Sequence, residues 1–347
     1  DERFVDNSKQ IFVIGQDANG NHVPNTYTAA NMVLDGLTFD GSVEQALVCN
    51  GAGPGSQCGL ALNNVVVQNT SGRGRVSGLW VTVTTDTDAV DLQITKSKFV
   101  NNLNRNTSNG AAIAISGTGR QASGDVKEMV ASVKIDQTEF RKNATLGGAS
   151  VFYVSDAIAV DLQLSNSIFA DNQSGKFGTS VAYVACKARE TCKGNITNSL
   201  FENNYAAGGI YGTAIYWSAG ELAVSQSTFR NNRSYGVQGG KVITAGYERY
   251  ALDDTAEPPV RNTLTLSVEN STFDSNEGDA DGIALAYLFK GDKVRLQSNT
   301  LLNNTALPVP ISELPGNLGG GQGKTSRAQL LALMVLANDA YDASVEV

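Results

Sequence analysis

Two kinds of hydrophobic pattern recur along this chain. In the first, apolar and polar residues alternate one for one, as at 90–94, 160–164 and 264–268. This is the period of a strand with one buried face. In the second, a short run is apolar at almost every position, and these runs lie at 111–115, 151–154, 181–184, 214–217 and 283–287. No helical period separates the two kinds of segment, so the pattern predicts an all-β protein.

A short motif follows most of the alternating segments. It has Ser or Thr, then Phe two residues later, then Asn three residues after the Phe. Six of the twelve Phe residues carry it: Phe99, Phe140, Phe169, Phe201, Phe229 and Phe273. Weaker copies lie at Phe39, at Val66 with Asn69, and at Leu301 with Asn304. The spacing between copies has a floor near 28 residues, which indicates one repeated unit with insertions of free length.

The repeat predicts the fold. Each unit holds at least two strands and two corners, and the absence of a helical period excludes βαβ crossovers. Stacked units of this kind form a parallel β-helix, with successive coils about 4.8 Å apart. We expect about nine coils over residues 1–305, which gives a rod roughly 40 Å long.

The motif residues have a physical role in such a rod. We expect each Phe to point inward and stack on the Phe of the next coil. We expect each Asn to lie at the corner after its strand, in the left-handed conformation that Asn tolerates. Stacked Asn side chains can hydrogen-bond to each other along the rod. The predicted ladder comprises Asn102, Asn143, Asn172, Asn204, Asn232, Asn276 and Asn304.

The Phe-x-x-Asn motif alternates with Gly-rich segments. Gly147-Gly148-Ala149 is the clearest of these, with variants at 110–112, 208–210 and 239–241. This combination resembles the repeats of the polymorphic outer-membrane protein family over roughly residues 30–305. The resemblance implies a right-handed parallel β-helix of the pectate-lyase-like kind and a surface-exposed, adhesive role.

Variable length is concentrated at one corner of the repeat, between an apolar run and the next alternating segment. Insertions at one corner gather on one side of a rod, where they often form a binding face. The longest insertion spans 246–263, and its candidate binding residues are Tyr247, Tyr250, Asp253 and Asp254. The alternative interpretation is a solvated loop without a binding role.

The four cysteines fit the same corner. Cys49 ends one apolar run and Cys58 begins the next alternating segment, and Cys186 and Cys192 hold these positions several coils later. We therefore expect the disulfides Cys49–Cys58 and Cys186–Cys192 rather than crossed pairs. A zinc site would need all four thiolates together. Disulfides indicate an oxidising compartment, so the sequence predicts a secreted or cell-surface protein.

Eight Asn-x-Ser/Thr sequons agree with secretion. Four coincide with the motif Asn, namely Asn69, Asn143, Asn172 and Asn232, and an Asn buried in a ladder cannot carry a glycan. The predicted glycosylation sites are therefore the other four: Asn106, Asn195, Asn270 and Asn303.

The C-terminal part differs in composition. Residues 306–325 are rich in Pro and Gly and are predicted to form a linker. Residues 326–342 contain a nearly continuous apolar run behind a Thr-Ser cap, which predicts a buried helix. That helix would either cover the open strand edges of the last coil or dock on a neighbouring subunit.

Charge and composition exclude some classes of partner. The formal net charge is −8, and no basic stripe that would suit nucleic acid is present. No apolar run is long enough to span a membrane. The expected partners are other copies of the chain, other extracellular proteins, or a polysaccharide.

Candidate catalytic residues are few. The single histidine, His22, makes a Ser-His-Asp triad improbable. Asp86, Asp88 and Asp91 form a candidate calcium cluster of the kind that pectate-lyase-type elimination needs, and Asp161 is expected near Asp91 in register. Asp279 and Asp281 offer a similar grouping. Recurrent Tyr residues in the apolar runs, Tyr153, Tyr183, Tyr216 and Tyr287, offer either a sugar-stacking stripe or core.

Two functional hypotheses follow. The first is a non-enzymatic structural or adhesive glycoprotein, without a cofactor, that acts through surface contacts and assembles into filaments or arrays. The second is a calcium-dependent polysaccharide lyase or a carbohydrate-binding β-helix that acts on acidic polysaccharide. The first is favoured because periodic core residues are abundant and catalytic constellations are scarce.

Overall fold

The structure is a computed structural model of the 347-residue chain. It describes residues 10–14, 28–51, 56–72, 76–83, 87–105, 110–117, 129–147, 149–154, 158–175, 181–186, 192–207, 213–234, 242–246, 251–253, 260–261, 263–278, 284–288, 291–306, 333–337 and 344–346.

Four parallel sheets run along the molecule, and we number them I to IV in the order in which the chain visits them.
Sheet I contains β1 (Gln10–Ile14), β4 (Gln45–Gly51), β8 (Leu79–Val83), β12 (Ile113–Gly117), β16 (Phe152–Val154), β20 (Ala182–Val184), β24 (Ile215–Trp217), β28 (Ile243–Ala245), β34 (Ala284–Leu288) and β38 (Leu333–Ala337).
Sheet II contains β2 (Thr28–Asp35), β5 (Ser56–Asn63), β9 (Thr87–Thr95), β13 (Met129–Asp136), β17 (Ile158–Ser165), β21 (Lys193–Thr197), β25 (Gly220–Ser225), β31 (Leu264–Glu269), β35 (Lys293–Gln297) and β39 (Ser344–Glu346).

The other two sheets have shorter strands.
Sheet III contains β3 (Thr38–Asp40), β6 (Val66–Gln68), β10 (Lys98–Val100), β14 (Glu139–Arg141), β18 (Ile168–Ala170), β22 (Leu200–Glu202), β26 (Thr228–Arg230), β32 (Thr272–Asp274) and β36 (Thr300–Leu302).
Sheet IV contains β7 (Ser71–Gly72), β11 (Leu103–Asn104), β15 (Ala144–Thr145), β19 (Gln173–Ser174), β23 (Tyr205–Ala206), β27 (Arg233–Ser234), β33 (Glu277–Gly278) and β37 (Thr305–Ala306).
One antiparallel pair, β29 (Ala251–Asp253) with β30 (Val260–Arg261), stands outside these sheets.

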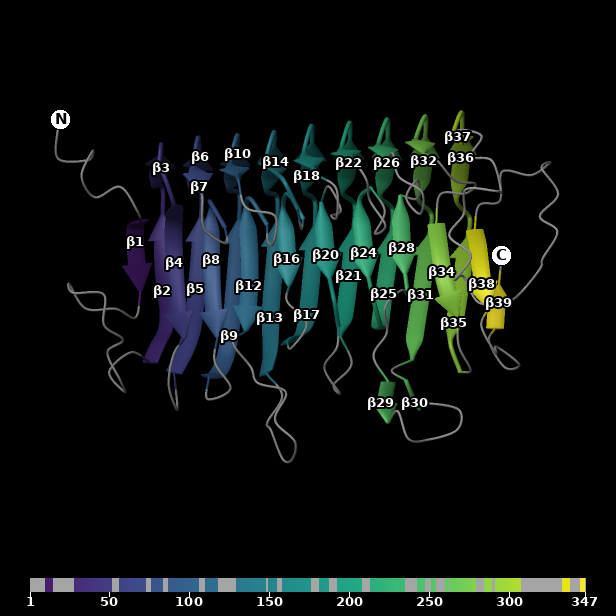
Figure 1. The fold of residues 1–347 in the computed structure, drawn as a ribbon, viewed down its shortest axis with the longest axis horizontal. Coiled ribbons are helices and arrows are strands. Elements are labelled where there is room, and N and C mark those ends of the chain that lie inside the picture. Colours follow the sequence, from purple (N-terminus) through teal and green to yellow (C-terminus); the bar gives the residue numbers. More distant parts are fainter. Residues whose placement is uncertain are drawn as a thin grey trace.

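The chain passes through sheets I, II, III and IV in turn, and each strand pairs with the equivalent strand of the next coil. Every pairing between successive coils is parallel, as between β10, β14 and β18 of sheet III. The result is an elongated stack with the N-terminal strands at one end and the C-terminal strands at the other (Figure 1). The fold is therefore an all-β parallel β-solenoid, as the repeat predicts, with four strands per coil where the sequence pattern required at least two.

The interior is filled by the inward positions of each strand. In sheet II the buried residues Leu92 and Ile94 pair with Val133 and Ile135 of the next coil. The alternating segments form this sheet because only one of its faces is buried. Apolar contacts between equivalent positions thus repeat from coil to coil, so each coil contributes burial only by stacking on its neighbours.

The motif phenylalanines stack in a single column inside sheet III. Ring centroids are 5.1 Å apart between Phe99 and Phe140, and 5.0 Å between Phe140 and Phe169. The column continues through Phe201, Phe229 and Phe273 at 4.7, 4.6 and 4.8 Å. All six rings are almost completely buried. Stacked rings add to area burial, so this column is a principal source of stability.

The second weak copy of the motif is displaced by one residue from the predicted register. Val67, rather than Val66, pairs with both Phe39 and Phe99. The ladder position of this coil is consequently held by Thr70, and Asn69 lies on the exposed surface. The apolar run 65–67 fits either register, and burial of the Thr70 hydroxyl against Asn102 decides between them.

The C-terminal helix predicted over 326–342 is not what the structure has at 333–337. These residues form β38, which pairs in parallel with β34, and residues 344–346 form β39 on β35. A short run that is apolar all round suits a strand buried on both faces as well as a helix. The open edge of β34 supplies backbone partners that a helix would leave unused. The remainder of this segment, and linker residues 307–325, lie outside the described residues.

Candidate functional site

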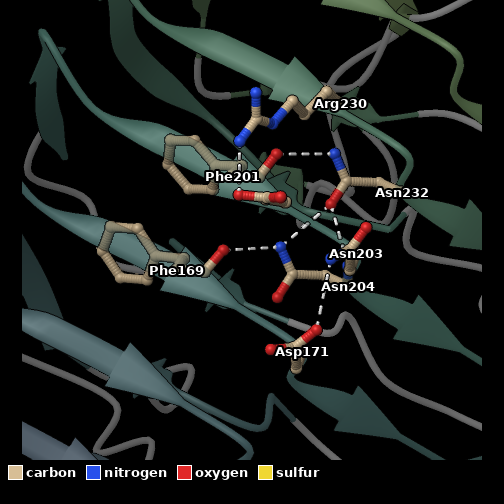
Figure 2. Close-up of polar contacts among 8 residues, drawn as sticks. Phe169, Asp171, Phe201, Asn203, Asn204, Arg230 and Asn232 are labelled. Atoms are coloured by element: carbon tan, nitrogen blue, oxygen red, sulfur yellow. Dashed lines mark hydrogen bonds and ion pairs between the residues drawn. The ribbon is translucent and has the colours of Figure 1, made fainter.

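The motif asparagines lie in one buried ladder at the corner between sheets III and IV. Each Nδ2 donates to Oδ1 of the Asn one coil further along. These distances lie between 2.9 and 3.0 Å for the successive pairs Asn102–Asn143–Asn172–Asn204–Asn232–Asn276–Asn304. Each Nδ2 also donates to a backbone carbonyl of the preceding coil, as from Asn204 to Phe169 at 3.0 Å (Figure 2). Every coil in the series is therefore bonded to both neighbours by side-chain amides.

The residue before each ladder Asn takes the left-handed conformation, not the ladder Asn itself. Positive φ occurs at Asn101 and Asn203, while Asn102 and Asn204 do not have it. The expectation that the motif Asn occupies this conformation is thereby corrected. The left-handed residue turns the chain outward, and the following Asn then points into the interior, where its amide is bonded on both sides.

A second buried ladder lies at the corner between sheets II and III, built from the Ser or Thr that precedes each Phe by two residues. Each hydroxyl accepts a backbone N–H from the preceding coil, as Ser167 does from Thr138 at 3.2 Å. The same hydroxyl donates to the carbonyl two residues earlier in its own coil, at 2.7 Å for Ser167 and Ser165. The members are Ser97, Thr138, Ser167, Ser199, Ser227 and Ser271. The constant distance between this Ser or Thr and the motif Phe is the sequence signal of the second ladder, but the spacing alone does not show which contacts the hydroxyl makes.

Exposed polar side chains near these corners also form hydrogen bonds between neighbouring coils. Asn166 donates to Asp136 at 2.7 Å and accepts from Asn198 at 2.7 Å. The pKa of Asp136 lies below its ordinary value, and the largest cause is a hydrogen bond donated by Ser165. Partial burial acts in the opposite direction. These surface hydrogen bonds link carboxylates to amides of neighbouring coils, as the buried ladders link side chains between coils in the interior.

The predicted disulfides are confirmed. Cys49 is bonded to Cys58, and Cys186 to Cys192, and each pair has its Cα atoms 6.1 Å apart. Both bridges join sheet I to sheet II across the same corner. In sheet II the register partner of Cys58 is Val90, and the same column continues through Ala131 and Val160. Because Asp161 pairs with Lys193, the next position in this column is Cys192.

The corner between sheets I and II is also where the longest described insertion projects. The β29–β30 pair extends from the body of the rod there (Figure 1). Of the predicted binding residues, Asp253 ends β29. Tyr247, Tyr250 and Asp254 lie outside the described residues.

The candidate calcium residues are only partly described. Asp91 lies on the outer face of sheet II, where its Oδ2 accepts from Gln93 at 3.3 Å. Asp161 belongs to the same column, but Ser132 separates the two, which places them two coils apart. Asp88 lies in β9 without a described side chain, and Asp86 lies outside the described residues. Within the described ranges, no group of three His, Cys, Asp or Glu side chains could hold a metal ion.

The recurrent tyrosines stack on the outer face of sheet I. Ring centroids are 5.2 Å apart for Tyr153 and Tyr183, and 4.7 Å for Tyr183 and Tyr216. Tyr216 is fully buried and the other two are half-buried. Tyr287 lies in β34, and its side chain is not described. A stripe whose last described ring is covered offers little open face for a sugar.

Three of the four predicted glycosylation sites are described, and all three are exposed. Asn195 lies on the outer face of sheet II, Asn270 at the corner between sheets II and III, and Asn303 at the corner between sheets III and IV. Asn106 lies outside the described residues. Asn143, Asn172 and Asn232 are completely buried, whereas Asn69 is exposed and belongs to the outer surface rather than to the ladder.

An open cleft of about 500 Å³ lies at the corner between sheets III and IV, lined by Asn203, Asn204, Tyr205, Asn231 and Arg233. Tyr205 and Arg233 are register partners on the outer face of β23 and β27. Asn203 and Asn231 are exposed left-handed residues of the two adjacent coils. The cleft is not evident in the sequence because its residues come from different coils. The position four residues after the motif Phe is the signal that could have found it.

None of the described segments forms a helix with the length and apolar character that a membrane crossing requires. Comparisons with protein-family models, curated proteins and solved structures found no match to this chain.

Proposed function

We propose that this chain is a secreted or cell-surface structural or adhesive protein, a rod that acts through surface contacts and assembles with other copies, and not an enzyme. The observation that carries the proposal is the arrangement of the ion pairs among the residues that the structure describes. The ion pairs lie between or within neighbouring coils and are spread along the rod, as Glu202 with Arg230 at 2.9 Å and Glu269 with Arg295 at 3.2 Å.

An enzyme concentrates titratable groups with perturbed pKa values in a cleft. On the described surface, the carboxylates with lowered pKa values owe this to local hydrogen bonds within the outer columns. Asp40, for example, accepts from Asn69 and Gln68. Such contacts favour a regular surface over a reactive one. The two disulfides add support for an oxidising compartment, because short-loop bridges persist where thiols are not kept reduced.

The experiment is sedimentation velocity over a wide range of protein concentrations, with electron microscopy of the same non-reduced samples. We expect species larger than the monomer that grow with concentration and appear as filaments or arrays. A concentration-independent monomer that cleaves a polyuronide in the presence of calcium would overturn the proposal. In that case, Asp91→Ala would test whether the exposed Asp91 takes part in the cleavage.

Glycan mapping tests separately which sequons the fold leaves accessible. The chain would be expressed through a eukaryotic secretory pathway and its sequons examined by mass spectrometry. We expect glycans at the exposed Asn195 and Asn270 and none on folded protein at the buried Asn143 and Asn172. Folded, soluble protein with occupied Asn143 would contradict the buried ladder itself.

A further inference from the structure

The cleft at Asn203, Tyr205, Asn231 and Arg233 has the chemistry of a saccharide site. Tyr205 supplies an aromatic side chain that is half-buried and lines the cleft. An aromatic ring of this kind packs against the apolar C–H face of a pyranose. Small-molecule sites typically combine such a surface with a few polar groups of fixed orientation, in volumes comparable to this one.

The polar groups around the ring are hydrogen-bonding groups with unused capacity. The exposed Asn203 donates through Nδ2 to Asp171 at 3.3 Å, and this bond does not use its Oδ1 acceptor. Asn231 is exposed, and among the described residues its carboxamide makes no side-chain hydrogen bond. A carboxamide both donates and accepts, which suits hydroxyl groups that do the same.

The backbone fixes these groups in place. Asn203 and Asn231 have φ of 53° each, and their backbone N–H groups donate to Arg230 and Asp274 of the following coils at 3.1 and 3.0 Å. The buried Asn204, a ladder member, forms the floor. The site is therefore preformed by the same ladder that holds the rod together, which reduces the entropy that binding would cost.

The charge of Arg233 and the net charge of the chain indicate which class of saccharide the cleft would bind. The Nε of Arg233 is 3.3 Å from Glu277, so its charge is already balanced, while its terminal amino groups remain as donors. The whole chain carries a net charge of −8, which repels polyanions at long range. Both observations favour a ligand without charge over a polyuronide.

We propose that this cleft binds a neutral oligosaccharide, with one sugar ring on Tyr205 and its hydroxyls on Asn203, Asn231 and Arg233. The inference goes beyond the proposed function, because such binding does not depend on whether the rods assemble. It also differs from the acidic-polysaccharide alternative considered for the sequence, both in ligand charge and in the face of the rod that is used.

Isothermal titration calorimetry of the full chain tests the proposal with defined hexasaccharides. The neutral probes are cellohexaose, laminarihexaose, mannohexaose and chitohexaose, and hexagalacturonate is the charged comparison. We expect at least one neutral probe to bind, and hexagalacturonate to bind at least about tenfold more weakly. No heat from any neutral probe at millimolar concentration, or tighter binding of hexagalacturonate, would overturn the inference.

Two variants with matched controls locate the binding. Tyr205→Ala should weaken binding about tenfold or more, whereas Leu103→Ala, at the same position of sheet IV three coils away, should leave it unchanged. Asn231→Gly removes the amide but retains the left-handed conformation, and Asn101→Gly makes the same change away from the cleft. Thermal melting checks that each variant is folded. Wild-type affinity in folded Tyr205→Ala and Asn231→Gly would place any binding elsewhere and refute the assignment.

Discussion

Removing one amide from the ladder should destabilise the rod far more than removing an exposed amide. The side chain of Asn172 makes four hydrogen bonds. Its Nδ2 donates to the Phe140 carbonyl at 3.1 Å and to Asn204 Oδ1 at 3.0 Å, and its Oδ1 accepts from the backbone and side-chain amides of Asn143 at 3.1 and 3.0 Å. Asn172→Ala deletes all four and leaves the buried N–H of Asn143 without this acceptor.

The magnitude follows from these contacts. A typical intramolecular hydrogen bond contributes about 1 kcal/mol net, and a buried polar group left unpaired costs about 1–3 kcal/mol. Relaxation of the neighbouring side chains recovers part of this. We therefore expect Asn172→Ala to lower the free energy of unfolding by about 3–4 kcal/mol. The exposed Asn195 is the matched control, and Asn195→Ala should change it by less than about 0.5 kcal/mol.

The assay is equilibrium urea unfolding followed by circular dichroism and by tryptophan fluorescence. Midpoint and slope are compared for both variants and the wild type, because a change in slope would indicate that the coils no longer unfold together. Equal losses in Asn172→Ala and Asn195→Ala, or a loss below about 1 kcal/mol in Asn172→Ala, would refute the claim that the ladder stabilises the rod.

Three further predictions concern the core, the surface and the disulfides. Phe169 packs between two other rings of its column, so Phe169→Ala should cost about 3–5 kcal/mol by urea unfolding, and a loss below about 1 kcal/mol would contradict the stacking argument. The pKa of Asp136 is lowered in the folded state, chiefly by Ser165, so its contribution is present above the ordinary value of about 3.9 and is lost as the pH falls through the lower folded pKa. Asp136→Asn should therefore flatten the fall in melting temperature between about pH 5 and pH 2, and an unchanged slope would exclude this role. Replacing Cys186 and Cys192 together by Ser opens a short loop and should cost about 2 kcal/mol or less, and failure to fold would show that the bridge does more than close that loop.

The sequence predicted the repeat because both buried columns impose strict spacing. A Phe can stack on its neighbour only at one position of each coil, and the ladder Asn must follow it at a fixed distance, so both positions are visible without a structure. The two disulfides were predictable for the same reason, since each pair falls at one corner of the repeat.

Other features were not accessible because local pattern did not distinguish the alternatives. The run containing Val66 and Val67 is apolar in both registers, and only the contact between Thr70 and Asn102 at 2.7 Å selects one. Residues 333–337 are apolar all round, which is compatible with a helix or with a buried strand, and pairing with β34 makes them a strand. These choices depend on contacts between coils and not on the residues of one segment.

The cleft depended even more on three-dimensional register. Tyr205 and Arg233 are neighbours because β23 and β27 pair in parallel, although their positions are 28 residues apart in the chain. Almost any polar residue is tolerated at a solvent-exposed position, so outward-facing positions need not repeat the same residue type from coil to coil. Only alignment of successive coils, column by column, would have brought these two side chains together.

Hydrogen exchange of the ladder amides tests the central claim most directly, namely that buried side-chain amides join the coils into one continuous rod. The backbone N–H groups of Asn143, Asn172, Asn204 and Asn232 each donate to the Oδ1 of the next ladder Asn, at 3.0–3.1 Å. Measured by mass spectrometry with fragmentation to single residues, these four amides should exchange only with global unfolding and be among the slowest in the chain. Exchange of these four amides at the rate of an unprotected amide in the unfolded chain would show that the ladder is open in solution and would contradict the account.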